Sequence, residues 1–443
     1  MKLFYQTLLA IFLFFPAVMA QDLRQDFEAY WKSSKQDLLA TYKHLHQNPE
    51  LFFQEKETSS LLAEKLRKLG YQVTEGIAKT GIAAVLKNGD GPTLLLRTDM
   101  DALPVEERTN LPYASSKKAE IKGQQVSVMH ACGHDIHMSV WLGTAAILAE
   151  NRSKWKGTVI FLGQPAEEVG AGAKAMLDDK LYQRIPKPDY ALALHVDPFI
   201  PTGSVGYVKG AAFANVDSVD ITIRGKGGHG AAPHKAIDPV VIAASYVQML
   251  QTIVSRQLSP TEPAVVTVGS IHGGTRYNII PDEVKLQITV RSYSRESRSQ
   301  ILSSLKKMAD AVAEAYSVPK ERYPIFEVNS GDAIETPATV NDSSLVDRVV
   351  KAWQSFWATE RVEQRQAEMI GEDFGRLGDG EPAIPAFMFR LGTTPATELE
   401  RLKKAGQEPA SLHSPLYAPD ADGAIPVGIE AMYIAIVEIL GKK

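Results

Sequence analysis

Residues 130–137 read His-Ala-Cys-Gly-His-Asp-Ile-His, and the rest of the chain is organised around this stretch. It places three histidines, an aspartate and the only cysteine of the protein within eight residues. Thiolate, imidazole and carboxylate groups are the side chains that bind transition metals at neutral pH. Gly133 lets the backbone bend so that Cys132 and His134 can aim at one point. A lone histidine is usually a hydrogen-bonded core residue, but a cluster this dense favours a metal site.

Length and composition limit the class of protein. The chain has 443 residues, a formal net charge of −4 and 23% charged residues. This length is enough for one large domain or two, with an ample core. No long basic block is present, so nucleic acid is not an expected partner. Since Cys132 has no second cysteine to pair with, its thiol must be buried, metal-bound or reactive.

The first twenty residues differ from the remainder. Lys2 gives a weakly positive start, residues 8–15 form an apolar run, and small residues precede Gln21. This pattern predicts a cleaved signal peptide over residues 1–20, and therefore a secreted or periplasmic protein. An uncleaved anchor is the alternative, but the run is shorter than the roughly 20 residues of a membrane span, and Pro16 interrupts it. Gln21 does not suit a lipoprotein, and no later stretch is expected to be apolar enough to cross a membrane.

Short apolar runs alternate with helical patterns along much of the chain. Buried strands are expected at residues 93–97, 158–163, 190–194 and 385–390. The clearest helix between them covers Met138–Glu150. The alternation predicts an α/β fold with a sheet flanked by helices on both faces.

The segment at residues 22–70 is expected to be mostly helical, with a break at Asn48-Pro49 and a second helix over Glu57–Leu69. His46 and Glu50 flank the break. An exposed helix end explains these two residues at least as well as a catalytic role does.

Polar side chains follow several of the predicted strands directly. In open α/β sheets, ligands bind beyond the carboxyl ends of the strands. The stretch at 130–137 precedes a helix and is expected to reach the same edge. We therefore expect five further residues to converge there: Asp99, Asp101, Glu167, Glu168 and His195.

A different pattern begins near Phe213. Strands are expected at residues 219–224, 264–271, 283–292 and 324–329, with helices at 238–257 and 295–316. The order β-α-β-β-α-β predicts an inserted α+β domain of ferredoxin-like type over residues 213–330. Because strand-like and histidine-bearing segments follow it, the insert interrupts a first domain, whose two parts are residues 21–212 and 331–443.

Two glycine-rich loops mark the insert, at residues 225–234 and 273–281. Neither matches a phosphate-binding loop. Their residues His229, Arg276 and Asn278 suit the binding of a carbonyl or carboxylate group. Ordinary turns are the alternative interpretation of each loop.

Taken together, these motifs resemble one family. They are RTDMDALP at 97–104, MHACGHDIH at 129–137, QPAEE at 164–168, LHV at 194–196, GGHGAAPH at 227–234, NIIPD at 278–282 and LHS at 412–414. In this order, and across nearly all of the mature chain, the sequence resembles the metal-dependent amidohydrolases of the M20 peptidase clan. It is most similar to the branch of hippurate hydrolases, N-acyl-amino-acid amidohydrolases and auxin-conjugate hydrolases.

The resemblance implies a site for two metal ions. Its ligands would be Cys132, His134, Glu168, His195 and His413. Cysteine would stand where related exopeptidases use a bridging aspartate. Thiolate and imidazole suit zinc, cobalt or nickel, and manganese is a further candidate.

The resemblance also implies roles for residues outside the ligand set. Glu167 matches the general base, and Asp101 matches a carboxylate that orients a ligand or the base. His229 matches an insert-domain histidine that reaches an active site, often that of the partner subunit. Asn278 and Arg276 lie where the family handles the substrate carboxylate. The insert would act as a lid and as the surface of a homodimer.

The expected reaction is hydrolysis of the amide bond of an N-acyl amino acid, with an acetyl, benzoyl or similar acyl group, to a carboxylic acid and a free amino acid. Two metal ions sharing a water lower its pKa toward about 7 and polarise the carbonyl. Glu167 would take the water proton and return it to the leaving amine. His229 would stabilise the tetrahedral oxyanion.

Three alternatives stay open. A cysteine hydrolase would use Cys132 as its nucleophile and would be blocked by thiol alkylation but not by chelators. A non-enzymatic metal-binding or receptor module would bind metal without hydrolysis. An aminopeptidase or dipeptidase of the same clan would prefer short peptides.

Two features depart from the family pattern. Ala386 stands where the family often has glycine, and the loop from Thr393 to Ser411 is longer and more charged than expected. These differences leave the pocket rim, and hence the acyl preference, undetermined by sequence.

Overall fold

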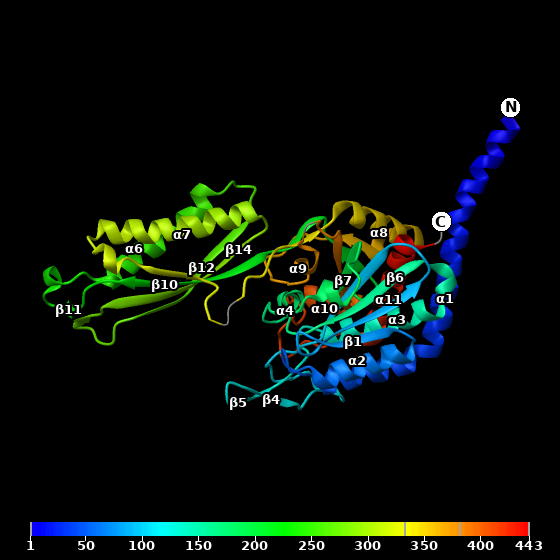
Figure 1. Ribbon diagram of the computed structural model, residues 1–443, viewed down its shortest axis with the longest axis horizontal. Coiled ribbons are helices and arrows are strands. Elements are labelled where there is room, and N and C mark those ends of the chain that lie inside the picture. The colour runs from blue at the N-terminus through cyan, green and yellow to red at the C-terminus, as the bar shows by residue number, and fades with distance from the viewer. Residues whose placement is uncertain (1, 332–333, 381, 442–443) are drawn as a thin grey trace. The chain divides into compact units, whose positions relative to one another are not determined.

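The computed structural model describes residues 2–331, 334–380 and 382–441, with side chains from Gln21 onward. The described chain forms two compact units (Figure 1). The first unit takes its residues from Met1–Gly210, Val340–Gln366 and Arg376–Lys443. The second takes its residues from Ala211–Thr339 and Ala367–Gly375.

The boundaries of the second unit correct the predicted insert of residues 213–330. The unit runs to Thr339 and includes a later segment, Ala367–Gly375. That segment joins through backbone hydrogen bonds, from Ala214 to Ile370 and from Glu368 to Ala212. Pairing between segments so far apart leaves no local signal in the sequence, which explains the missed segment.

A mixed sheet of eight strands forms the centre of the first unit. The strands are β1 (Gln72–Ile77), β2 (Gly81–Asn88), β3 (Thr93–Asp99), β6 (Gly157–Gln164), β7 (Tyr190–Pro201), β8 (Val205–Tyr207), β17 (Val362–Gln364) and β18 (Ala386–Thr394). Their order is β1-β2-β6-β3-β7-β18-β8-β17. The neighbours β6, β3, β7 and β18 run parallel and correspond to the four predicted apolar runs. Their side chains are almost all buried, as expected for strands covered on both faces.

Helices flank this sheet, and several of them pack on one another. They are α1 (Lys2–Gln47), α2 (Lys56–Lys68), α3 (His134–Glu150), α4 (Gly172–Asp178), α5 (Leu181–Arg184), α8 (Ser343–Phe356), α10 (Ala396–Lys404) and α11 (Ala421–Leu440). Helix α3 packs on β3 and β7, α11 packs on β18, and α1 packs on both α3 and α11. The break predicted at Asn48-Pro49 is confirmed, because α1 ends just before it. The short α9 (Gly375–Gly378) spans the boundary between the two units' ranges.

Helix α11 corrects one expectation from the sequence. Among the described side chains, it is the one helix that is long and apolar enough to cross a membrane. However, 72% of its apolar window is buried within the structure, including the side chains of Ile429, Tyr433 and Ile436. A helix surrounded by core is apolar on every face, so composition alone cannot separate it from a membrane span.

The second unit is built on an antiparallel sheet. Its main elements are β10 (Asn215–Arg224), α6 (Pro239–Thr252), β12 (Ala264–Gly273), β14 (Glu283–Ser292), α7 (Arg295–Ala315) and β15 (Ile325–Val328). The strand order is β12-β14-β10-β15, with both helices packed on the sheet. The predicted β-α-β-β-α-β order is confirmed. Asp238 caps α6 through the backbone N–H of Val240, and Ser294 caps α7 through that of Ser297.

Short strands complete the described chain. They are β4 (Lys118–Ile121) paired with β5 (Gln124–Ser127), β11 (Gly228–His229) paired with β13 (Ile279–Ile280), and the strands β9 (Gly210–Phe213) and β16 (Thr339–Asn341).

Candidate metal centre

A tight turn before α3 presents two of the predicted ligands. Gly133, between Cys132 and His134, has φ 74°, in the left-handed region that favours glycine. A Cβ at this position would lie 2.7 Å from a methyl carbon of Val196. Both the backbone conformation and the available space therefore require glycine here, and the turn brings the two ligand side chains into the buried interior.

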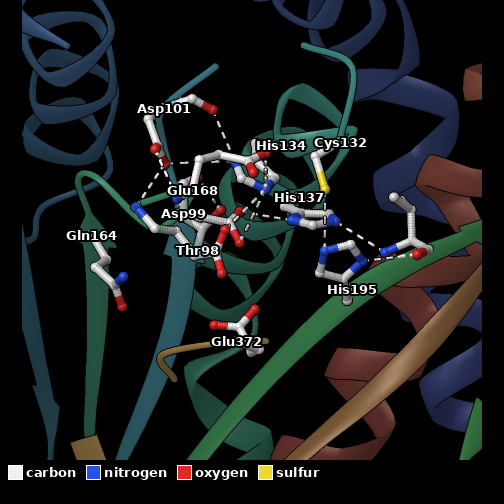
Figure 2. A network of polar contacts seen from close by, with 12 residues as sticks. Thr98, Asp99, Asp101, Cys132, His134, His137, Gln164, Glu168, His195 and Glu372 are labelled. Carbon is white, nitrogen blue, oxygen red and sulfur yellow. Dashed lines mark hydrogen bonds and ion pairs between the residues drawn. The ribbon is translucent and has the colours of Figure 1, made fainter. Parts of the chain in front are cut away.

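Two histidines are held so that the same nitrogen of each ring faces the cluster. The Nδ1 atom of His134 lies 2.8 Å from the backbone oxygen of Asp101, and Nδ1 of His195 lies 2.8 Å from that of Val196. Each Nδ1 must donate its proton to the carbonyl, so Nε2 is the atom that each ring presents to the cluster, and in the neutral ring it carries the lone pair. Nε2 of His195 lies 3.6 Å from the sulfur of Cys132, which points toward it in Figure 2.

Carboxylates surround Nε2 of His134. The nearest oxygens belong to Asp99 at 3.6 Å, Glu168 at 3.8 Å and Glu167 at 4.0 Å. Among the described residues, this buried Nε2 has no hydrogen-bond partner. Burial lowers the pKa of His134, but the carboxylates, Asp99 foremost, outweigh it and raise the pKa to about 10. Three carboxylates this close together are stabilised by a positive charge between them.

A second group joins the same cluster from the C-terminal part of the chain. His413 has φ 65° and donates its backbone N–H to the carbonyl of Ala131, 2.8 Å away. Its Nε2 lies 3.4 Å from Oε2 of Glu168. Burial raises the pKa of Glu168 to about 8, and burial also lowers that of His413. The strained backbone at His413 thus serves to bring its ring against Glu168.

The donor atoms fit a metal centre. One group, Cys132, His134 and His195, and another, Cys132, Glu168 and His413, each have their ligand atoms within 4.8 Å of one another. Cys132 belongs to both groups, as a ligand shared between two ions would. Soft thiolate, neutral imidazole and carboxylate together match divalent transition metals. The unpartnered Nε2 of His134 and Oε1 of Glu168 are the buried polar atoms that such ions would satisfy.

The carboxylate of Asp101 contacts the backbone of both predicted glutamates. Its Oδ1 accepts the N–H of Glu167 and its Oδ2 accepts the N–H of Glu168, each at 3.0 Å. The backbone oxygen of the same residue orients His134. Asp101 therefore positions three predicted site residues at once, from the end of β3.

His137 lies beside the cluster, but both of its ring nitrogens have partners. Nε2 accepts the N–H of Val196 at 2.9 Å, so Nδ1 donates to Asp99 at 2.6 Å. Asp99 also pairs with Arg97 at 2.6 Å. His137 is therefore a support for Asp99 rather than a ligand, although the sequence motif alone does not separate the two roles.

His46 corrects the interpretation of the N-terminal break as an exposed helix end. Its ring is buried, with Nδ1 2.6 Å from Asp135 and Nε2 3.0 Å from Glu107. Burial lowers the pKa of His46, but these carboxylates raise it to about 10. The charged imidazole links α1 to Asp135, the residue after His134. Glu50, by contrast, is half-buried and accepts the N–H groups of Glu57 and Thr58 at the start of α2.

The remaining predicted residues lie in the second unit. His229 pairs with Ile279 across the β11–β13 ribbon, and Gly230 donates its N–H to the carbonyl of Asn278 at 2.9 Å. His229, Arg276 and Asn278 are all exposed. The structure thus brings the two glycine-rich loops together within this unit. The roles proposed for their residues stay predictions.

The sequence predicted a loop from Thr393 to Ser411. In the structure, residues 396–404 of this segment form the helix α10. The charges that made it look like a loop lie on this helix, where Arg401 pairs with Glu398 at 2.7 Å. Ala386, which stands where the family often has glycine, is the first residue of β18 and pairs with Ala191 of the parallel strand β7.

Sequence reasoning also missed Glu55. It is fully buried and accepts the N–H of Ala166, the residue before Glu167. Nothing in the local sequence signals this contact, because Glu55 stands among charged residues at the start of a helix.

Comparisons with known proteins agree with this geometry. The profile of peptidase family M20/M25/M40 matches residues 95–405. N-acetyl-L-cysteine deacetylase of Bacillus subtilis (strain 168) is 40% identical over 354 residues, covering 80% of each chain. Hippurate hydrolase of Campylobacter jejuni is 37% identical over 346 residues, covering 78% of this chain and 85% of that one.

A solved structure extends the match to three dimensions. The crystal structure of a Bacillus subtilis dinuclear metal-binding peptidase of the M20 family superposes with a TM-score of 0.74 at 29% identity. The match covers 92% of this chain and 99% of that one. The chain therefore belongs to peptidase family M20/M25/M40, as its motifs predicted, and is a hydrolase of the amidohydrolase and peptidase class.

Proposed function

We propose that the protein hydrolyses the amide bond of N-acyl amino acids, releasing a carboxylic acid and a free amino acid. The observation that carries this proposal is that two groups of candidate metal ligands share Cys132. Beside them, Oε2 of Glu167 lies 4.0 Å from Nε2 of His134. The names of two relatives, N-acetyl-L-cysteine deacetylase and hippurate hydrolase, support acetyl and benzoyl groups as the acyl part.

The side chains divide the work of the reaction. Cys132, His134, Glu168, His195 and His413 would hold two divalent ions, of zinc, manganese, cobalt or nickel. When bound, such ions polarise the amide carbonyl and lower the pKa of a water molecule. Glu167 accepts a proton from the attacking water and returns it to the nitrogen as the C–N bond breaks. Asp101 keeps Glu167 in place through the backbone.

Three residues of the second unit are proposed to contact the substrate. His229 is proposed to donate a hydrogen bond to the oxyanion of the tetrahedral intermediate. Arg276 and Asn278 are proposed to bind the substrate carboxylate, because a guanidinium and an amide match its geometry. Their exposure supports contact with a ligand rather than a role in the core of the unit.

The test combines elemental analysis with a substrate panel. The purified protein is stripped of metal, reloaded separately with zinc, manganese, cobalt or nickel, and assayed on N-acetyl and N-benzoyl amino acids and on dipeptides. The proposal expects two bound ions per chain and faster cleavage of the acyl amino acids. Faster cleavage of dipeptides would favour the peptidase alternative, which the dinuclear peptidase among the structural neighbours supports.

We also propose that residues 1–20 direct export and are removed before Gln21, and that the mature protein is a homodimer. The mass of the protein recovered from the periplasm or medium tests the first point. Sedimentation equilibrium tests the second.

A further inference from the structure

The turn that carries Glu167 is held by carboxylates from outside it. Three successive backbone N–H groups, those of Ala166, Glu167 and Glu168, all donate to carboxylate oxygens. Asp101 accepts two of them, and Glu55 accepts the first at 2.9 Å. Ala166 itself has φ 51°, a left-handed conformation that is costly for a residue with a Cβ. An external contact must therefore stabilise this backbone.

The place of Glu55 in the chain shows that its carboxylate does not serve its own helix. Glu55 occupies the N-cap position of α2, but its side chain makes no capping hydrogen bond there. Glu50 accepts the first N–H groups of that helix instead, from Glu57 at 3.2 Å and Thr58 at 2.8 Å. The carboxylate of Glu55 is thus available for contacts elsewhere.

Those contacts immobilise both of its oxygens. Oε1 accepts N–H groups from Phe53 and Ala166, each at 2.9 Å. Oε2 accepts the hydroxyl of Thr80 at 2.6 Å. Glu55 is fully buried, so no rearrangement toward solvent competes with this arrangement. The side chain links three separate segments at the base of the turn.

We propose that Glu55 is a positioning residue that fixes the backbone at Ala166 and thereby aims Glu167. This inference rests on the proposed function, in which Glu167 transfers the proton. Loss of the contact would let Ala166 relax toward an ordinary conformation and shift the neighbouring side chain. A misplacement of about 1 Å in an active site can cost about 10²-fold in rate.

Three variants of Glu55 separate positioning from charge and from folding. Glu55→Ala removes all three contacts. Glu55→Gln keeps them, because its amide oxygen can accept both N–H groups while its NH₂ donates to Thr80. Glu55→Asp retains the carboxylate on a shorter side chain and serves where the alanine variant does not fold. Glu50→Ala is the matched control, since it also removes two backbone contacts of a carboxylate in the same segment.

We expect Glu55→Ala to lower kcat about 10- to 100-fold, with little change in KM and an unchanged metal content by elemental analysis. Glu55→Gln should stay within about threefold of the parent, and Glu50→Ala should keep the parent kcat. Hydrogen exchange supplies a readout that needs no activity. Exchange should rise in the peptide covering residues 164–172 for Glu55→Ala, and in α2 alone for Glu50→Ala.

Several outcomes would overturn the inference. One is a folded Glu55→Ala or Glu55→Asp variant with the parent kcat and unchanged exchange at residues 164–172. Another is an equal loss in the alanine and glutamine variants, which would assign the effect to charge. A loss of kcat in Glu50→Ala would show that the loss in Glu55→Ala comes from general destabilisation. A parent protein that cleaves no panel substrate would instead overturn the proposed function, and the exchange data would still decide the role of Glu55.

Discussion

Most predicted site residues of the first unit are buried, whereas those of the second unit are exposed. In the first unit, His134, His195 and Glu167 lie buried near the carboxyl ends of parallel strands, and each is oriented through a hydrogen bond to its ring or backbone. In the second unit, His229 lies exposed on a ribbon whose strands are two residues long, and Asn278 lies exposed directly before one of these strands.

We expect this difference to separate two kinds of functional residue. Groups that hold metal or move protons need fixed distances and a site largely shielded from water, which the buried edge of the sheet supplies. Groups that only meet the substrate can remain exposed on a small ribbon. Changes in the first unit should therefore alter both chemistry and stability, whereas changes at the ribbon should leave the free energy of unfolding nearly unchanged.

Removal of metal should produce the largest contrast between the units. We expect a chelator to abolish hydrolysis, because the proposed ions would polarise the amide carbonyl and lower the pKa of the attacking water. Bound metal at 1,000 times its Kd stabilises the fold by about 4 kcal/mol. Hydrogen exchange should rise at residues 130–137 and 164–168 and stay unchanged in β10 and β14. Full activity after chelation, with loss on thiol alkylation, would instead support the cysteine-hydrolase alternative.

Glu167→Gln should separate chemistry from metal binding within the first unit. We expect kcat to fall about 10³-fold, because the amide cannot accept the water proton. Elemental analysis should find the same metal content as in the parent, whereas the matched variant Glu168→Gln should lose metal. Near-parental turnover in Glu167→Gln would remove this residue from the role of base.

His46→Gln should reveal how much the ion pairs of His46 with Glu107 and Asp135 stabilise the fold. In the folded state the pKa of His46 is raised from 6.5 to about 10. Below pH 6.5 the imidazole is protonated whether or not the chain is folded, so the ion pairs contribute fully. As the pH rises from 6.5 toward 10, the unfolded state loses the proton first, and this contribution to the free energy of unfolding declines.

The expected decline between pH 7 and pH 9 is up to about 3 kcal/mol, from about 1.4 kcal/mol per pH unit. Urea unfolding at several pH values measures it. The glutamine variant should show a flatter profile than the parent over this range. His44→Gln, which changes an exposed histidine of the same helix, is the control and should match the parent. Identical slopes in the parent and His46→Gln would contradict a charged imidazole at this position.

Arg276→Ala should give the smallest effect and test the ribbon. Loss of one charged hydrogen bond to the substrate carboxylate should raise KM about tenfold. The free energy of unfolding should change by less than about 0.5 kcal/mol, since the side chain is exposed. Lys285→Ala removes another exposed cation of the same unit and should leave KM unchanged. A large loss of stability in Arg276→Ala would remove the distinction between the two units.

Much of the first unit could be predicted from local patterns. The four central strands follow from continuous apolar runs, because parallel strands buried on both faces leave no room for polar side chains. The clustering of Asp99, Asp101, Glu167 and His195 follows from their positions after those strands. The ferredoxin-like order of the second unit follows in the same way from its alternating strands and amphipathic helices.

Other features could not be predicted because they depend on contacts between distant segments. The buried environment of His46 is created by Asp135 and Glu107, and that of Glu55 by Ala166 and Thr80. Composition could not distinguish the buried α11 from a membrane span, since the packing of its neighbours alone decides what its apolar surface meets.

The sequence by itself determined which chemical groups the protein uses and near which strands they stand, because ligand type and apolar periodicity are local properties. Only the tertiary structure decided which carboxylate binds which backbone N–H, which histidine nitrogen carries the lone pair, and that Ala367–Gly375 joins the second unit. Hydrogen bonds act over about 3 Å, and which atoms come that close is decided only once the chain has folded.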